Sequence, residues 1–115
     1  MNERRRQRLS GDLLAAVEEI LAREVSDARL RAVHVTGVKL SRDGSHATLF
    51  YEVTETSVNR REDVRNAMES AKGFIRSRLA SRMKLKSVPI LSLVLDSSGE
   101  EGDRVIRLIR ELMGD

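Results

Sequence analysis

The part of this sequence best suited to binding another molecule is a basic stretch without any acidic residue. The segment 70–95 holds no Asp or Glu, and its cations are Lys72, Arg76, Arg78, Arg82, Lys84 and Lys86. The whole chain has a net charge of +3 and this segment alone contributes +6, so the remaining residues sum to −3. Cations concentrated in this way favour binding to the phosphate backbone of a nucleic acid. The absence of acids favours this hypothesis over a merely solvated basic face.

A second basic cluster opens the chain and consists of Arg4, Arg5, Arg6 and Arg8. These residues fall where an amphipathic helix is predicted to begin. Cations at the positive end of a helix dipole are unfavourable unless an anion lies nearby. The cluster is therefore a secondary candidate for phosphate contact, and a solvated start to the chain is an equally good interpretation.

Catalytic and metal chemistry are not expected from these residue types. The chain has no Cys, which excludes disulfides and thiolate metal sites. Its two histidines, His34 and His46, fall in predicted strands and are expected to face solvent, and two imidazoles without a third ligand do not make a metal site. No serine has a credible base and orienting acid. We expect no enzyme activity, no metal and no cofactor.

Other bulk features narrow the class of protein further. Phe50, Tyr51 and Phe74 are the only aromatic residues, so a sheet that stacks bases on aromatic rings is not available. No segment resembles a secretory signal or a membrane span, so we expect a cytoplasmic protein that contacts no membrane.

Two predicted strands follow a first predicted helix. Residues 4–25 place apolar side chains at helical spacing. Residues 33–40 alternate like a strand, but the apolar phase shifts at Thr36 and Gly37, which predicts a β-bulge. After a turn, residues 47–53 alternate again, so the two strands are predicted to form a hairpin.

The basic stretch lies mainly on a predicted helical region. Asn59 and Glu62 fit a capping box, and an apolar stripe continues from there to Met83. Gly73 interrupts this pattern at a cost of about 1 kcal/mol relative to Ala. We interpret it as a bend between two helices and expect Gly73→Val to be the most damaging single substitution.

The end of the chain is predicted to add a strand and a helix. Residues 88–95 are apolar on both faces, and Pro89 suits the beginning of such a strand. Asp103 can cap a final helix with an apolar side. The Gly-x-x-Gly pattern at residues 99–102 resembles a backbone clamp, but its two glutamates would repel phosphate.

These elements predict one domain that spans residues 1–115. Its fold class is α+β, with a three-stranded mixed sheet covered by helices. The crossover of roughly thirty residues between the second and third strands is long enough to set them parallel.

The sequence resembles the ribosome-binding factor A family over nearly its whole length. The resemblance rests on REVSDARL at 23–30, VKLSRDGSHATLFY at 38–51, AKGFIRSRLASRMKLKSVPILSLVLD at 71–96 and SSGEEGDRVIRLIREL at 97–112. It implies a type II KH-like domain in which a helix-kink-helix of form Ala-x-Gly, here Ala71, Lys72 and Gly73, replaces the usual glycine clamp. Family members commonly carry Pro and Gly where this chain reads DARLR at 27–31, so its turn there is expected to differ.

The resemblance also implies a function and partners. The family binds the small (30S) ribosomal subunit during late maturation of 16S rRNA, without catalysis or cofactor, supports growth in the cold, and leaves when assembly GTPases act. We therefore expect a monomeric RNA-binding protein of ribosome biogenesis. The alternative is a DNA-binding or nucleoid-associated basic module, and a second rival is an adaptor that binds a protein through the last helix.

Overall fold

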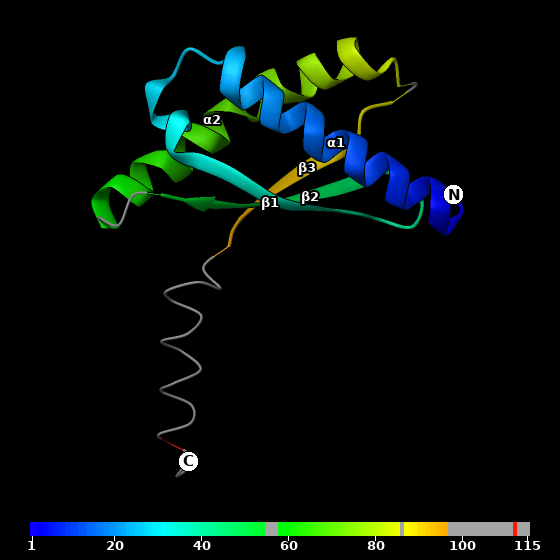
Figure 1. Cartoon of the computed structure of the whole chain (residues 1–115), viewed down its shortest axis with the longest axis horizontal. Helices are drawn as coiled ribbons and strands as arrows, with labels where there is room; N and C mark the ends of the chain where they lie inside the picture. The colour runs from blue at the N-terminus through cyan, green and yellow to red at the C-terminus, as the bar shows by residue number, and fades with distance from the viewer. Residues whose placement is uncertain (55–57, 86, 97–111, 113–115) are drawn as a thin grey trace.

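The computed structural model describes residues 1–54, 58–85, 87–96 and 112 of the chain. The elements follow one another in an α+β order (Figure 1). They are α1 (Glu3–Arg23), the short 3₁₀ helix η1 (Ala28–Ala32), β1 (Val33–Leu40), β2 (His46–Val53), α2 (Val58–Met83) and β3 (Ile90–Leu95).

The three strands form one mixed sheet in the order β1-β2-β3. The β1–β2 pair is antiparallel, and its register shifts between Val35 and Gly37, which confirms the predicted bulge. The β2–β3 pair is parallel, with His46 opposite Ile90, because α2 carries the chain back across the sheet. The predicted mixed sheet is therefore confirmed.

Both long helices lie on the same side of the sheet, and the core fills the space between them and the strands (Figure 1). The helical spacing of the apolar residues explains this arrangement, because one stripe of each helix is buried. The fully buried side chains include Leu13, Val17 and Ile20 of α1, Ala47 and Leu49 of β2, and Met68, Ile75 and Leu79 of α2.

The turn between β1 and β2 is held by its own side chains. Gly44 adopts a φ of +76°, a left-handed conformation that glycine reaches without steric cost. The Asp43 carboxylate accepts hydrogen bonds from the hydroxyl groups of Ser41 and Ser45 and from the Ser45 backbone N–H. A side chain at position 44 would meet the side chain of Met1, so the turn lies against the beginning of the chain.

The helical region that carries the basic stretch differs from its prediction. The structure has one continuous α-helix from Val58 to Met83, which begins one residue before the predicted cap at Asn59. Gly73 has no left-handed backbone, and a Cβ built on it would contact nothing within 4 Å. The expectation that Gly73→Val is the most damaging substitution for folding is therefore wrong, because neither strain nor crowding supports it. A bend within the continuous helix stays a prediction.

The chain leaves α2 through a left-handed residue, Lys84, whose φ is 49°. A left-handed residue directly after a helix is a common way to end it. Strand β3 begins at Ile90, directly after Pro89, which agrees with the place expected for that proline. The predicted final helix and the Gly-x-x-Gly pattern at 99–102 lie outside the described residues.

Candidate nucleic-acid interface

Arg76 is a structural link between α2 and the segment before β3. Its guanidinium donates hydrogen bonds to the backbone carbonyls of Pro89, at 3.1 Å, and Val88, at 3.0 Å. A planar guanidinium can satisfy two acceptors at once, which an ammonium group cannot do in the same geometry. The sequence predicted a phosphate contact here, but in the structure the group that would bind phosphate already holds two carbonyl oxygens.

Arg78 and Arg82 face acidic residues at the C-terminal end of α1, where Glu24 directly follows the helix. Arg82 lies 3.0 Å from carboxylate oxygens of both Glu19 and Glu24, and Nε of Arg78 lies 3.7 Å from Glu24. The Arg78 guanidinium also sits 5.0 Å from the centre of the Phe74 ring, within the range of a cation–π contact. The basic stretch contains no acid of its own, but α1 supplies two, and the pairing of α1 with α2 is what brings them there.

The other three cations of the basic stretch, Lys72, Lys84 and Lys86, differ in whether they have a partner. Lys72 forms an ion pair with Glu69, three residues earlier, at 3.2 Å. Lys84 is exposed and has no partner among the described residues. Lys86 lies outside the described residues. We call Lys72, Arg76, Arg78 and Arg82 the paired α2 cations.

The N-terminal arginines are mostly free of partners. Arg6 pairs with Glu3, but Arg4, Arg5 and Arg8 are exposed and hold no ion pair within the described part of the chain. The helix start is capped by Asn2, whose side chain accepts a hydrogen bond from the backbone N–H of Arg5.

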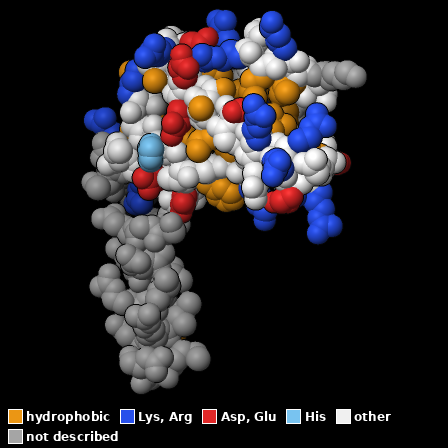
Figure 2. All heavy atoms as spheres, turned by 45° about the vertical axis from the view of Figure 1, so that its right-hand side comes forward, with side chains coloured by type: hydrophobic (Ala, Val, Ile, Leu, Met, Phe, Trp, Pro, Cys, Tyr) orange, Lys and Arg blue, Asp and Glu red, His pale blue; other side chains and the backbone are white. Residues whose placement is uncertain are grey.

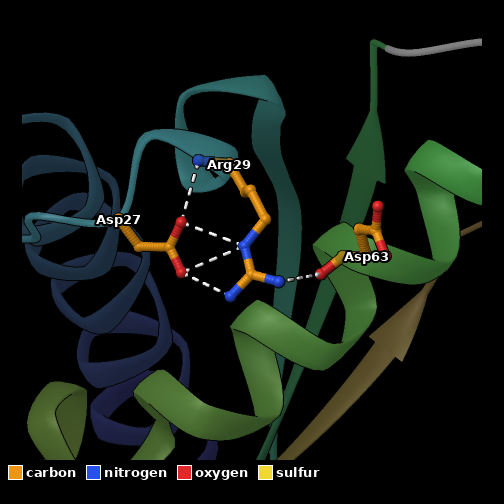
Figure 3. Close-up of polar contacts among 3 residues, drawn as sticks. All are labelled: Asp27, Arg29 and Asp63. Atoms are coloured by element: carbon orange, nitrogen blue, oxygen red, sulfur yellow. Dashed lines mark hydrogen bonds and ion pairs between the residues drawn. The ribbon is translucent and has the colours of Figure 1, made fainter.

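Two further arginines fix the turn between α1 and β1, and sequence analysis missed them. Arg29 pairs with Asp27 at 2.7 Å and donates to the backbone carbonyl of Asp63 in α2 (Figure 3). Arg31 donates to the carbonyls of Leu21 and Val25, at the end of α1 and just beyond it, where helix carbonyls lack partners within the helix. The hydrogen bonds from Arg29 lower the pKa of Asp27, so this carboxylate stays ionised. The segment that lacks the family's Pro and Gly is thus a capped 3₁₀ helix.

A shallow groove of about 280 Å³ lies between the end of α1 and the middle of α2. Its walls include Ala71 and Phe74, together with the acidic residues Glu24 and Asp27. Carboxylates on one wall make it a poor receptor for phosphate. Within the described residues, no group of three His, Cys, Asp or Glu side chains could hold a metal ion, and His34 and His46 are both exposed, as expected. No helix in this part of the chain could cross a membrane.

Comparison with known sequences places the chain in a family. A sequence model described as Ribosome-binding factor A matches residues 5–109. Ribosome-binding factor A of Dictyoglomus thermophilum is 37% identical over 109 residues, which cover 94% of this chain and 90% of that protein. The protein of the same name from Lacticaseibacillus casei strain BL23 is 33% identical over 105 residues, covering 91% and 90%. The chain belongs to the ribosome-binding factor A family.

Solved structures of the family share the fold. The crystal structure of ribosome-binding factor A from Thermus thermophilus aligns with a TM-score of 0.67 at 24% identity, over 78% of this chain and 93% of that one. A homology model of the Thermus thermophilus factor, fitted into a cryo-EM map of a 30S complex, aligns with a TM-score of 0.66 at 25% identity, covering 79% and 94%. These structures have a KH-like fold, which confirms the predicted fold class.

Proposed function

We propose that this protein binds the small ribosomal subunit through its 16S rRNA during late maturation, without catalysing a reaction. The observation that carries the proposal is membership of a family in which one relative is fitted into a 30S complex. The proposal includes a cytoplasmic, monomeric protein that needs no cofactor, supports rRNA processing and growth in the cold, and is released by an assembly GTPase.

The exposed side of α2 around Gly73 suits close approach of an RNA backbone. Gly73 is exposed with open space above it, so a phosphate could reach the helix without meeting a side chain at this position. Lys72 lies beside it, and its ion pair with Glu69 is a surface pair of the kind worth at most about 1 kcal/mol. An RNA phosphate can therefore replace the glutamate at little cost.

The ion pairs of Arg78 and Arg82 can also be exchanged. Half of the Arg78 side chain and a third of the Arg82 side chain are exposed to solvent. Phosphate would compete there with Glu24, a neighbour that is itself partly exposed. Arg76 is different, because leaving its two carbonyl acceptors would cost two hydrogen bonds from a charged donor. We propose that Arg76 supports the interface, whereas Lys72, Arg78, Arg82, Lys84 and Lys86 contact RNA.

Salt dependence of binding to purified small subunits tests this function. If about four to six phosphates are neutralised, log K should fall against log salt with a slope of roughly −3 to −5. A slope near zero would contradict the electrostatic interface and would instead fit an adaptor that binds a ribosomal protein. Equal retention on duplex DNA at matched salt would favour the nucleoid-associated alternative.

A further inference from the structure

Six described cations whose side chains hold no partner among the described residues lie on elements that meet at one end of the molecule. Arg4, Arg5 and Arg8 belong to the first turns of α1, Lys39 and Arg42 to the end of β1 and the following turn, and Lys84 to the exit from α2. Each of these residues is exposed, and its side chain has no hydrogen-bond or ion-pair partner among the described residues. We call this surface the basic end, with the members Arg4, Arg5, Arg8, Lys39, Arg42 and Lys84.

Three separate elements build this end. Met1 reaches the turn at Gly44, so the beginning of α1 and the β1–β2 turn are neighbours. Ile90 donates a backbone hydrogen bond to the Ser45 carbonyl, which places the segment after α2 beside the same turn. Figure 1 shows the N-terminus, this turn and the end of α2 on the same side, and Figure 2 brings that side forward with Lys and Arg side chains spread over it.

Two acidic residues at this end already accept hydrogen bonds from neighbouring side chains. Glu3 accepts from Arg6 and Gln7, and Asp43 accepts from the serines of its own turn. Asp12 stands four residues after Arg8 but forms no ion pair with it. Among the described residues at this end, the unpaired cations therefore outnumber the unpaired acids, whereas each of the paired α2 cations holds an oxygen of the protein.

We infer that the basic end is a second contact surface for the phosphate backbone of the small subunit's RNA, which adjoins the proposed α2 contacts at Lys84 and adds Lys39 and Arg42 to them. The inference rests on the proposed function. Free, exposed guanidinium and ammonium groups release counterions when they meet phosphates, and they do so without first breaking an internal ion pair. The expected partner is a polyanionic strand, because the cations lie on three elements and do not line a single pocket.

A pair of charge reversals tests the inference against a matched control. The Arg8→Glu/Arg42→Glu variant alters the basic end. The Arg23→Glu/Arg60→Glu variant alters two exposed arginines that hold no ion pair among the described residues and belong to the end of α1 and the beginning of α2, which lie on the opposite side of the molecule (Figure 1). Each pair changes the net charge from +3 to −1. We expect the first variant to bind purified small subunits at least tenfold more weakly at about 0.1 M salt, with a salt slope shallower by about 2.

The control should stay within threefold of the wild type. Equal weakening of the two variants, or wild-type binding by the first, would overturn the inference while leaving the proposed function intact. Failure of the wild type to bind small subunits would overturn the proposed function itself. The Arg8→Gln/Arg42→Gln variant guards against misfolding and should lose affinity in the same direction, with an unchanged melting temperature. An unchanged affinity of this milder variant would also count against the basic end.

A tethered cleavage reagent gives a readout of position. Because the chain has no natural cysteine, Arg42→Cys and Arg60→Cys each create a unique attachment site for an iron chelate that generates hydroxyl radicals. Strand cleavage of 16S rRNA from position 42 and not from position 60 is the expected result. Cleavage from position 60 alone would exclude the basic end as a contact, and labelling of a ribosomal protein without RNA cleavage would point to a protein partner there.

Discussion

The paired α2 cations and the basic end carry the same residue types in opposite states. On α2, each of the four side chains already holds a carboxylate or carbonyl oxygen of the protein. At the basic end, six cations hold none within the described residues. Position in the fold contributes to the difference, since the packing of α1 against α2 brings Glu19 and Glu24 to Arg78 and Arg82. At the basic end, no described acid forms an ion pair with any of the six cations.

This contrast teaches that a run of basic residues does not by itself identify the cations available to RNA. The α2 stretch has the higher local charge in the sequence, yet part of that charge stabilises the protein's own packing. Arg4, Arg5 and Arg8 belong to a separate basic cluster, and Lys39, Arg42 and Lys84 are isolated from it in the sequence. Folding brings the elements that carry them to the same side of the molecule (Figure 1). Variants of the paired α2 cations should therefore lower the stability of the protein, whereas variants of the basic end should weaken RNA binding and leave stability unchanged.

The largest expected effect comes from reversing charge on α2. The Arg76→Glu/Arg78→Glu/Arg82→Glu variant should lose roughly 2–4 kcal/mol of unfolding free energy, because it removes hydrogen bonds to two carbonyls and sets new glutamates against Glu19 and Glu24. Urea unfolding measures this change.

The matched control for that variant is Arg4→Glu/Arg5→Glu/Arg8→Glu, with the same change in charge. It should leave stability unchanged or slightly raised, because it breaks no ion pair and places acids in the first turns of α1, at the positive end of the helix dipole. Equal destabilisation by both triple variants would show that net charge, not the internal pairing of α2, controls stability.

Arg76 should account for most of the loss on α2. Arg76→Ala is expected to cost roughly 1–2 kcal/mol, since two buried or half-buried carbonyls lose a charged donor. Arg76→Lys should recover only part of this loss, because one ammonium group cannot reproduce the two-point geometry. If thermal unfolding shows that Arg76→Lys is as stable as the wild type, only the positive charge of Arg76 matters for stability.

Two helical glycines give a smaller effect that separates α2 from α1. Gly73 and Gly11 are both exposed within helices, with no neighbour within 4 Å of an added Cβ. Replacing either with Ala should raise the unfolding free energy by about 0.5–1 kcal/mol. We expect only Gly73→Ala to weaken binding to small subunits. If neither variant changes binding, the α2 face around Gly73 is not the point of close approach.

The smallest effect concerns the turn within the basic end. Hydrogen bonds from Ser45 and Ser41 lower the pKa of Asp43 from 3.8 to about 2. A depressed folded-state pKa adds stability that is present above the unfolded value and is lost as pH falls through the folded value. The wild type should therefore lose its advantage over Asp43→Asn between about pH 4 and pH 2, as followed by urea unfolding.

Local patterns predicted the architecture well. The phase shift at Thr36 marked the bulge, and the length of the crossover indicated that β3 pairs parallel with β2. The bend predicted at Gly73 stays a prediction, because a glycine lowers helix propensity without showing whether neighbouring turns will hold the helix together. The structure keeps that helix continuous by burying Met68, Ile75 and Leu79 on either side of the glycine.

The sequence by itself predicted the three strands and the long helices of the described residues with their order, the family, and the concentration of positive charge between residues 70 and 95. It did not predict η1 or the continuity of α2 through Gly73. It could not determine which cations are free. Arg82 lies about sixty residues after its partners Glu19 and Glu24, and Arg76 lies a dozen residues before its partners Val88 and Pro89. The periodic pattern of the sequence therefore does not indicate that these residues come into contact. Only the packing of α1 and β3 against α2 decides these pairs, because ion pairs and hydrogen bonds depend on distances of a few ångströms that arise after the chain has folded.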